Sequence, residues 1–290
     1  MAQRLFITGG AGYLGAELIQ QALTGGWDVT TTFFSSHPMI AAVQWLPLDI
    51  RDAVAVEQAF ARQRPDIVIH TAYRQNGPDM RPTTVHGTEL VARACEASGA
   101  RLIHLSSDAL FDGQPPNGRY TEADDPCPIT PYGEAKAAAE RLVDQISPAA
   151  LIVRTSLIYG GAEPSVHEQL IFDALAGRAD LAFFTDELRC PIAVGDLAAA
   201  LLDLAPRAIS GRLHIAGAEV ISRYAFARAL ATAHGHDPIG LRAGSSATSA
   251  MRRPRNCALD ISKAQNLLQT QLRGVSDVLG RYDMRAMADS

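Results

Sequence analysis

Lysine is scarce in this 290-residue chain, in which only two of the 26 basic residues are lysines and the others are arginines. Acidic residues outnumber basic ones, and the net charge is −5. The chain also lacks a basic cluster interleaved with aromatic side chains. A protein with this charge balance is not expected to bind nucleic acid or an anionic membrane surface.

Cysteines and long apolar runs are also few. The four cysteines lie far apart and form no C-x-x-C pair, so we expect neither a metal site nor a disulfide framework. No Asn-x-Ser/Thr sequon is present, and no apolar run approaches the roughly 18 residues that a membrane span needs. The first residues, "MAQRLFITGG", have none of the features of a signal peptide. These absences together predict a reduced, cytoplasmic setting.

What is present in residues 1–156 is an alternation of short apolar runs with amphipathic stretches. The runs occupy residues 4–9, 28–34, 66–72, 101–107 and 150–156. Their Val, Ile, Leu, Phe and Thr content, with little polar alternation, is typical of strands buried on both faces. Strands that alternate with helices predict an α/β fold, with a doubly wound parallel sheet of Rossmann type.

The alternation changes in two places. Residues 112–131 contain five prolines and form a long predicted loop, which we interpret as a wall of the active site. After residue 156 the pattern degrades into shorter elements, including a helix that should begin after Ser222 as its N-cap. We therefore predict a smaller mixed substrate-binding lobe over residues 157–290, from which some of the chain can cross back to the sheet.

The stretch "ITGGAGYLG" (7–15) joins the first predicted strand to the first predicted helix. Its glycines allow a pyrophosphate to approach the backbone, and the helix N-terminus offers free N–H groups to that anion. The motif in this context predicts a dinucleotide site. An NAD site usually has an acidic residue at the end of the second strand, whereas this strand ends in "TFFSSHP". We therefore favour NADP over NAD.

The stretch "PYGEAK" (131–136) contains one of the two lysines. A proline before a sequence of high helix propensity predicts a helix start, which places Tyr132 and Lys136 on one face. At about 5 Å and an effective dielectric near 20, the lysine charge favours the phenolate by roughly 3 kcal/mol, or about 2 pKa units. We therefore expect Lys136 to lower the pKa of Tyr132 toward the working pH of a general acid.

A pair of serines, Ser106 and Ser107, ends the strand at 101–107. Open α/β sheets bind their ligands at this carboxyl edge, where the glycine turn also lies. A hydroxyl group there can hydrogen-bond a substrate carbonyl. A hydride carrier, a proton donor and a carbonyl anchor together indicate a carbonyl reductase or alcohol dehydrogenase.

These motifs resemble those of the extended short-chain dehydrogenase/reductases. More narrowly, "LSSDALFDG" (105–113), "PITPYGEAKAAAE" (128–140), "DELRCPIAVGDLA" (186–198), "LHIAGAEVISRYAFA" (213–227) and "RRPRNCALDISK" (252–263) resemble the dTDP-4-dehydrorhamnose reductase family. The resemblance implies NAD(P)H-dependent reduction of a nucleotide-linked 4-keto-6-deoxy sugar or a related polar ketone. Tyr132 would donate the proton, Lys136 would hold the nicotinamide ribose, and Ser107 would bind the carbonyl oxygen.

Further site residues follow from the glycine turn, the strand ends and the resemblance. The expected cofactor contacts are Gly9, Gly12, Tyr13, Leu14, Gly15, Ser35, Ser36, Asp49, Ile50, Thr71, Ala72, Tyr73, Tyr132 and Lys136. The expected substrate contacts are Ser107, Asp108, Arg189 and Arg253, of which the two arginines could bind a phosphate. The resemblance also suggests a homodimer or a monomer.

The chain departs from the family's pattern at Thr84, where the family has an asparagine, and in the short segment 73–84. The segment borders the substrate site, so these departures concern the identity of the ketone more than the chemistry. Two alternative functions stay open. One is epimerisation or dehydration of a nucleotide sugar with tightly held NAD, and the other is a cofactor-binding regulatory subunit without turnover.

Overall fold

A seven-stranded parallel sheet organises the computed structural model, which describes residues 3–35, 43–249 and 251–280. The strand order is β11-β6-β5-β4-β1-β2-β3, and every neighbouring pair is parallel. The strands are β1 (Arg4–Thr8), β2 (Asp28–Phe33), β3 (Gln44–Pro47), β4 (Ile67–His70), β5 (Arg101–Ser107), β6 (Leu151–Thr155) and β11 (Gly211–His214). The predicted α/β class with a Rossmann-type sheet is confirmed.

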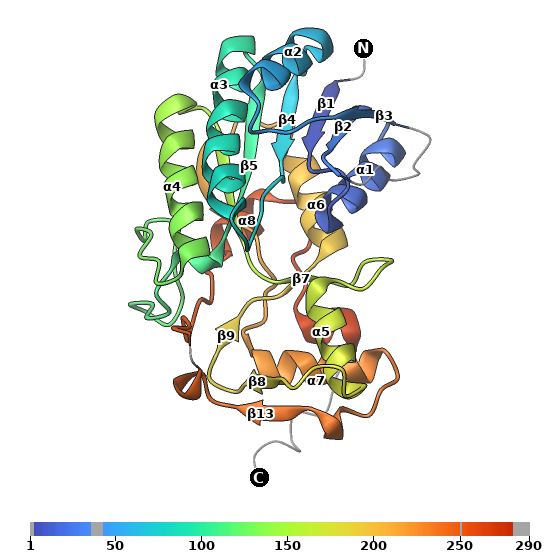
Figure 1. The fold of residues 1–290 in the computed structure, drawn as a ribbon, viewed down its shortest axis with the longest axis vertical. Helices are drawn as coiled ribbons and strands as arrows, with labels where there is room; N and C mark the ends of the chain where they lie inside the picture. The colour runs from blue at the N-terminus through green and yellow to red at the C-terminus, as the bar shows by residue number, and fades with distance from the viewer. Residues whose placement is uncertain (1–2, 36–42, 250, 281–290) are drawn as a thin grey trace.

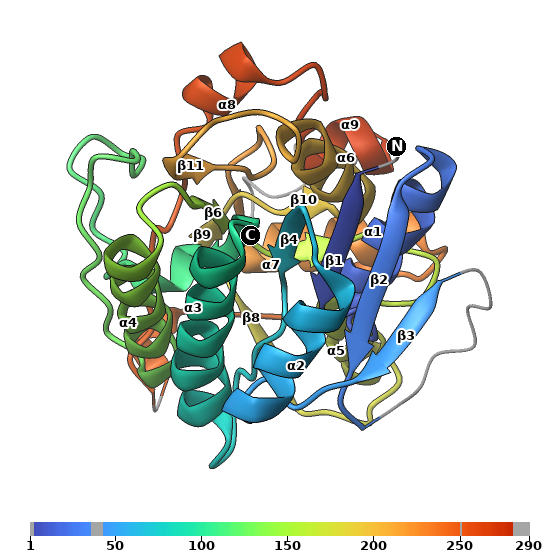
Figure 2. The same cartoon turned by 90° about the horizontal axis from the view of Figure 1, so that it is seen from above.

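Helices cover both faces of this sheet (Figures 1 and 2). One layer holds α1 (Tyr13–Thr24) and α6 (Val194–Leu204); the other holds α2 (Ala53–Gln63), α3 (Thr88–Ser98) and α4 (Pro131–Ile146). Alternate residues of a strand point to opposite faces. In β1, Leu5 and Ile7 therefore join the core beneath α1 and α6, while Phe6 joins the core beneath α2 and α3.

A smaller lobe follows β6 and lies below the sheet in Figure 1. Its helices are α5 (Val166–Leu175), α7 (Arg223–Ala233) and α9 (Val275–Leu279). Its strands form three short pairs, β7 (Ile158–Tyr159) with β10 (Ile192–Ala193), β9 (Leu188–Arg189) with β12 (Ile221–Ser222), and β8 (Ala182–Phe184) with β13 (Arg242–Gly244). As predicted, the Ser222 side chain caps α7, accepting a hydrogen bond from the Ala225 N–H at 3.1 Å.

The chain returns from this lobe to the sheet domain at α6, which packs on α1, and at β11, which pairs with β6. A further short helix, α8 (Ser262–Leu267), packs beside β11. None of the helices in the described part of the chain is both long and apolar enough to cross a membrane.

The proline-rich stretch 112–130 contains no helix and no strand longer than a single bridge, as predicted. It is fastened to the C-terminal part of the chain by backbone hydrogen bonds. The Tyr120 N–H donates to the Ala258 carbonyl at 2.8 Å, and the Asp260 N–H donates to the Tyr120 carbonyl at 2.7 Å. The stretch is therefore held in place by distant residues.

Candidate functional site

The glycine turn connects β1 to α1, and close backbone packing explains its composition. Gly9 has a φ of +76°, and a Cβ there would lie 2.9 Å from the Ala72 backbone. A Cβ on Gly15 would lie 2.3 Å from the Gly9 carbonyl oxygen. Helix α1 begins after Gly12 without a side-chain cap, so its first N–H groups are available to an anion. The turn therefore fits a pyrophosphate.

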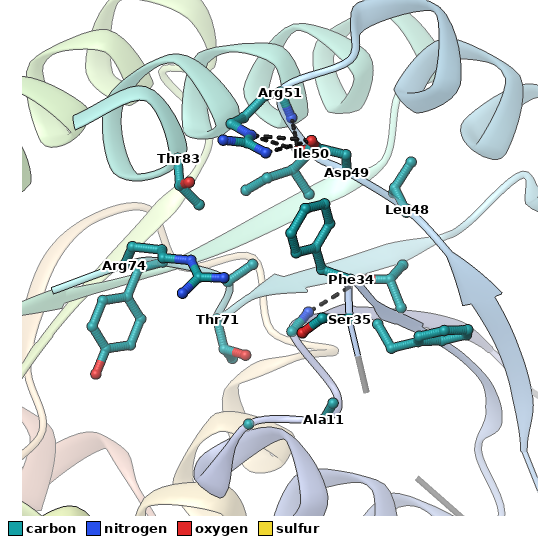
Figure 3. Close-up of a pocket in the computed structure, with 16 residues that line it drawn as sticks. Ala11, Phe34, Ser35, Leu48, Asp49, Ile50, Arg51, Thr71, Arg74 and Thr83 are labelled. Atoms are coloured by element: carbon teal, nitrogen blue, oxygen red, sulfur yellow. Dashed lines mark hydrogen bonds and ion pairs between the residues drawn. The ribbon is translucent and has the colours of Figure 1, made fainter. Parts of the chain in front are cut away.

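A cavity of about 430 Å³ lies beside this turn, at the carboxyl ends of β1, β2 and β4 (Figure 3). Of the expected cofactor contacts, those that line it are Gly9, Gly12, Ser35, Asp49, Ile50, Thr71, Ala72 and Tyr73. Ser36 lies outside the described residues. The other predicted residues of the turn face elsewhere: Leu14 and Gly15 are buried, and the Tyr13 hydroxyl accepts a hydrogen bond from the Gly161 N–H at 2.6 Å.

Two arginines that no sequence motif marks, Arg51 and Arg74, also line this cavity. Arg51 lies 5.3 Å from the centre of the Phe34 ring and pairs with Asp49 at 2.8 Å. This pairing lowers the pKa of Asp49, chiefly through the side-chain hydrogen bond. Arg74 enters the cavity from the opposite side to Phe34 and Ser35 (Figure 3). Neither arginine belongs to a recognisable sequence motif, so only their position in the fold distinguishes them from the other arginines of the chain.

Tyr132, Lys136 and Ser107 come together next to the cavity. Helix α4 begins at Pro131, and its N-cap Thr130 accepts a hydrogen bond from the Gly133 N–H at 3.1 Å. The Tyr132 ring lies 5.8 Å from that of the cavity residue Tyr73, between ring centres. The ammonium of Lys136 lies 4.9 Å from the centre of the same Tyr73 ring. The expected proximity of the tyrosine, the lysine and the cofactor cavity is therefore present.

Ser107 rather than Ser106 is the serine directed to Tyr132. A hydrogen bond with Ser107 acts to lower the pKa of Tyr132. Ser107 also accepts a hydrogen bond from the Ala109 N–H at 3.2 Å. The Ser106 side chain is buried on the other side of the strand. The alternation of β5 thus separates the two serines.

The expected lowering of the Tyr132 pKa by Lys136 is wrong for this arrangement. Burial raises the pKa of Tyr132 well above its usual value, and Tyr73 and Asp108 act in the same direction. Burial also lowers the pKa of Lys136 to about 8. Its ammonium donates to the Leu105 carbonyl at 2.7 Å instead of to the phenol. Desolvation, which sequence spacing cannot reveal, is the largest cause of both pKa shifts.

Asp108 and Arg189, two of the expected substrate residues, form a charged cluster with Glu187 beside Ser107. Asp108 is buried, which raises its pKa, and it accepts a hydrogen bond from the Ser156 hydroxyl at 2.7 Å. The Arg189 guanidinium lies 3.7 Å from Asp108 and 3.0 Å from Glu187, and it donates to the Pro254 carbonyl. These protein acceptors occupy Arg189, so the geometry favours a bracing role over the direct phosphate contact that we expected.

Three comparisons with known proteins agree on the family. The model of the RmlD substrate binding domain matches residues 3–284. A dTDP-4-dehydrorhamnose reductase of Mycobacterium tuberculosis is 34% identical over 275 residues, covering 91% of this chain and 86% of that protein. The rat methionine adenosyltransferase 2 subunit beta is 29% identical over 283 residues, covering 92% of this chain and 83% of that protein.

Solved structures show the same fold. A dTDP-4-dehydrorhamnose reductase from Bacillus anthracis in complex with NADP superposes with a TM-score of 0.82 at 24% identity, covering 96% of this chain and 98% of that one. A hypothetical dTDP-4-dehydrorhamnose reductase from Sulfolobus tokodaii has a TM-score of 0.79 at 26% identity, covering 93% of this chain and 97% of that one. The resemblance predicted from the motifs is confirmed: the chain belongs to the RmlD substrate binding domain family.

Proposed function

We propose that this protein is an NADPH-dependent oxidoreductase of the extended short-chain dehydrogenase/reductase type, which reduces the keto group of a nucleotide-linked 4-keto-6-deoxy sugar. The observation that carries the proposal is the meeting of Ser107, Tyr132 and Lys136 beside a cavity that begins at the glycine turn. The substrate class comes from the relatives named dTDP-4-dehydrorhamnose reductase.

The residues present fit a dinucleotide. The glycine turn leaves no room for a Cβ at Gly9 or Gly15, so its backbone can approach the diphosphate closely. Arg74 brings positive charge to the cavity, Arg51 is paired there with Asp49 and Asp79, and the described end of β2 brings no carboxylate. A 2′-phosphate is compatible with such a lining, whereas an NAD site usually has an acidic residue at this strand end. This difference favours NADPH.

The mechanism assigns one task to each of the three residues. A dinucleotide held at the glycine turn would supply the hydride for the carbonyl carbon. Ser107 orients the carbonyl oxygen, and Tyr132 gives its phenolic proton to that oxygen as the alkoxide forms. Because burial raises the pKa of Tyr132, the phenol is protonated at neutral pH and ready to donate. Lys136, whose pKa of about 8 leaves it mostly charged there, would hold the nicotinamide ribose of the bound dinucleotide.

The test follows NADPH oxidation with a dTDP-4-keto-6-deoxy sugar, and repeats it with NADH. Tyr132→Phe should lower kcat by roughly 10²- to 10⁴-fold, because it removes the proton donor and little else. Tyr224→Phe, which changes a tyrosine on α7, serves as the matched control. Equal kcat in Tyr132→Phe and wild type would contradict the assignment of the proton donor.

A regulatory subunit without turnover is the second candidate, favoured by the 29% identity to a protein named as the beta subunit of methionine adenosyltransferase 2. NADPH binding without oxidation in the presence of any nucleotide-linked ketone would support it. The epimerase or dehydratase alternative calls for tightly held NAD. It would be supported by NAD that stays with the protein through purification.

A further inference from the structure

A group of mostly buried charges, in which the cations are in excess, lies where the smaller lobe meets the end of β5. We name it the arginine cluster: Arg189, Arg223, Arg253, Asp108 and Glu187. The pKa of Arg223 responds to the charges of all four other members, so the group is electrostatically connected. Two carboxylates face three guanidinium groups, which leaves one positive charge without a counter-ion inside the cluster.

The pairing of β9 with β12 brings Arg223 into the cluster, although no sequence motif marks this residue. In this antiparallel pair Ile221 lies opposite Arg189 and Ser222 lies opposite Leu188. The register continues with a hydrogen bond of 2.9 Å from the Arg223 N–H to the Glu187 carbonyl. Arg223 is then the first residue of α7. Its position is thus determined by backbone pairing and not by a flexible loop.

The two carboxylates already have other partners. Glu187 lies 3.0 Å from Arg189 and 3.8 Å from Arg253, and Asp108 lies 3.7 Å from Arg189. The Nη1 atom of Arg223 is buried and has no hydrogen-bond partner among the described residues, and the same holds for the Oε2 atom of Glu187. A buried charge without a partner costs several kcal/mol. Such a group is retained where a ligand supplies the missing charge.

The neighbouring helix α5 does not supply the missing negative charge through His167. Burial lowers the pKa of the His167 imidazole to about 3, and the positive charge of Arg223 acts in the same direction. His167 is therefore neutral at physiological pH. Burial lowers the pKa of Arg223 itself to about 10, so the guanidinium keeps its proton at neutral pH. The excess positive charge persists under working conditions.

We propose that Arg223 binds a phosphate oxyanion of the substrate and so selects nucleotide-linked ketones over uncharged ones. The inference rests on the proposed function and deepens it. Asp108 connects the two ends of the site, because it follows Ser107 directly and its charge acts on both Tyr132 and Arg223. Asp108 also lies 3.7 Å from Arg189, which is paired opposite Ile221, two residues before Arg223. The arginine cluster therefore adjoins the residues around the reacting carbonyl.

The other two arginines have different tasks in this arrangement. Arg189 holds Glu187 and the Pro254 carbonyl and braces the cluster. Arg253, whose side chain is 40% exposed, lies over the Phe184 ring at the rim and can approach the same anion from the solvent side. Of these three arginines, only Arg223 has a buried side-chain nitrogen without a hydrogen-bond partner among the described residues, so its loss should have the larger effect.

The experiment compares Arg223→Gln with Arg228→Gln, a matched change on the same helix at a residue that lies over the Tyr224 ring. Binding of dTDP, inorganic pyrophosphate and thymidine is measured by calorimetry, alongside the KM for the nucleotide-linked ketone. We expect Arg223→Gln to weaken dTDP binding and raise KM by on the order of 10- to 100-fold, the loss of one charge-assisted hydrogen bond. Thymidine and NADPH binding should not change.

A purely structural role would give a different pattern. If Arg223 held the fold, Arg223→Gln would lower the melting temperature, whereas removal of an unpaired buried cation should leave it unchanged or raise it. Equal dTDP affinity and equal KM in the two variants would overturn the inference and leave the reductase function intact. If Arg223→Gln alone lost dTDP affinity but wild type reduced no nucleotide-linked ketone, the anion site would stand and the proposed function would fail.

Discussion

The buried charge of Lys136 should make this residue harmful to stability at neutral pH. Its side chain is 4% exposed, and burial lowers its pKa to about 8 from an ordinary value near 10.5. At about 1.36 kcal/mol per pKa unit, the charged form costs the folded state about 3 kcal/mol. Loss of the hydrogen bond to the Leu105 carbonyl offsets about 1 kcal/mol of the gain. Lys136→Met should therefore be more stable than wild type, with a free energy of unfolding about 2 kcal/mol higher.

The pH dependence of the stability difference between Lys136→Met and wild type tests whether burial of the lysine charge causes it. Below pH 8 both the folded and unfolded chains carry the lysine proton, so the penalty is fully present. Between pH 8 and about 10.5 the unfolded chain binds more protons than the folded one, and wild type therefore gains stability as the pH rises. The advantage of Lys136→Met should shrink over that range. Urea unfolding without cofactor at pH 7 and pH 9.5 measures both values.

The second lysine of the chain is the control. Lys263→Met changes an exposed side chain that donates to the Arg212 carbonyl at 3.1 Å, and it should alter stability little at either pH. The reasoning is refuted if Lys136→Met is less stable than wild type at pH 7, or if its advantage is the same at both pH values. Lys136→Met should also lose reductase activity, so that stability and activity change in opposite directions.

Two further predictions concern the framework of the site. In wild type the buried guanidinium of Arg154 lies 2.9 Å from the Glu140 carboxylate, and Glu140→Leu removes this partner. The free energy of unfolding should therefore fall by about 3 to 5 kcal/mol. A fall of less than about 1 kcal/mol would contradict this prediction. Gly15→Ala places a Cβ 2.3 Å from a carbonyl oxygen of the glycine turn, so NADPH affinity by fluorescence titration should drop sharply. Gly195→Ala, where the nearest atoms are at 3.7 Å, should bind NADPH as wild type does.

Sequence patterns predicted the central strands because those strands are buried on both faces and carry continuous apolar runs. The edge strand β3 was missed, since four residues that end in a proline are too few to show a period. The glycine turn, Ser107, Tyr132 and Lys136 were predictable because each lies at a fixed place relative to a strand end or a helix start.

The charges around these residues were not predictable. Whether Lys136 lowers the pKa of Tyr132 depends on how much water each group loses, which only the packing of α4 against β5 determines. Arg223 meets Glu187 through the register of β9 and β12, two strands of two residues each. Pairs this short leave no periodic signal in the sequence.

The return of the chain to the sheet at α6 and β11 means that its two parts are interleaved rather than sequential. A fragment that ended at residue 156 would lack β11, so the edge of β6 would be exposed, and Leu197 and Leu201 would be missing from the core. Neither part can therefore be exchanged as an independent module. Because the chain passes between the two parts more than once, we expect their relative movement to be smaller than that of two domains joined by a single linker.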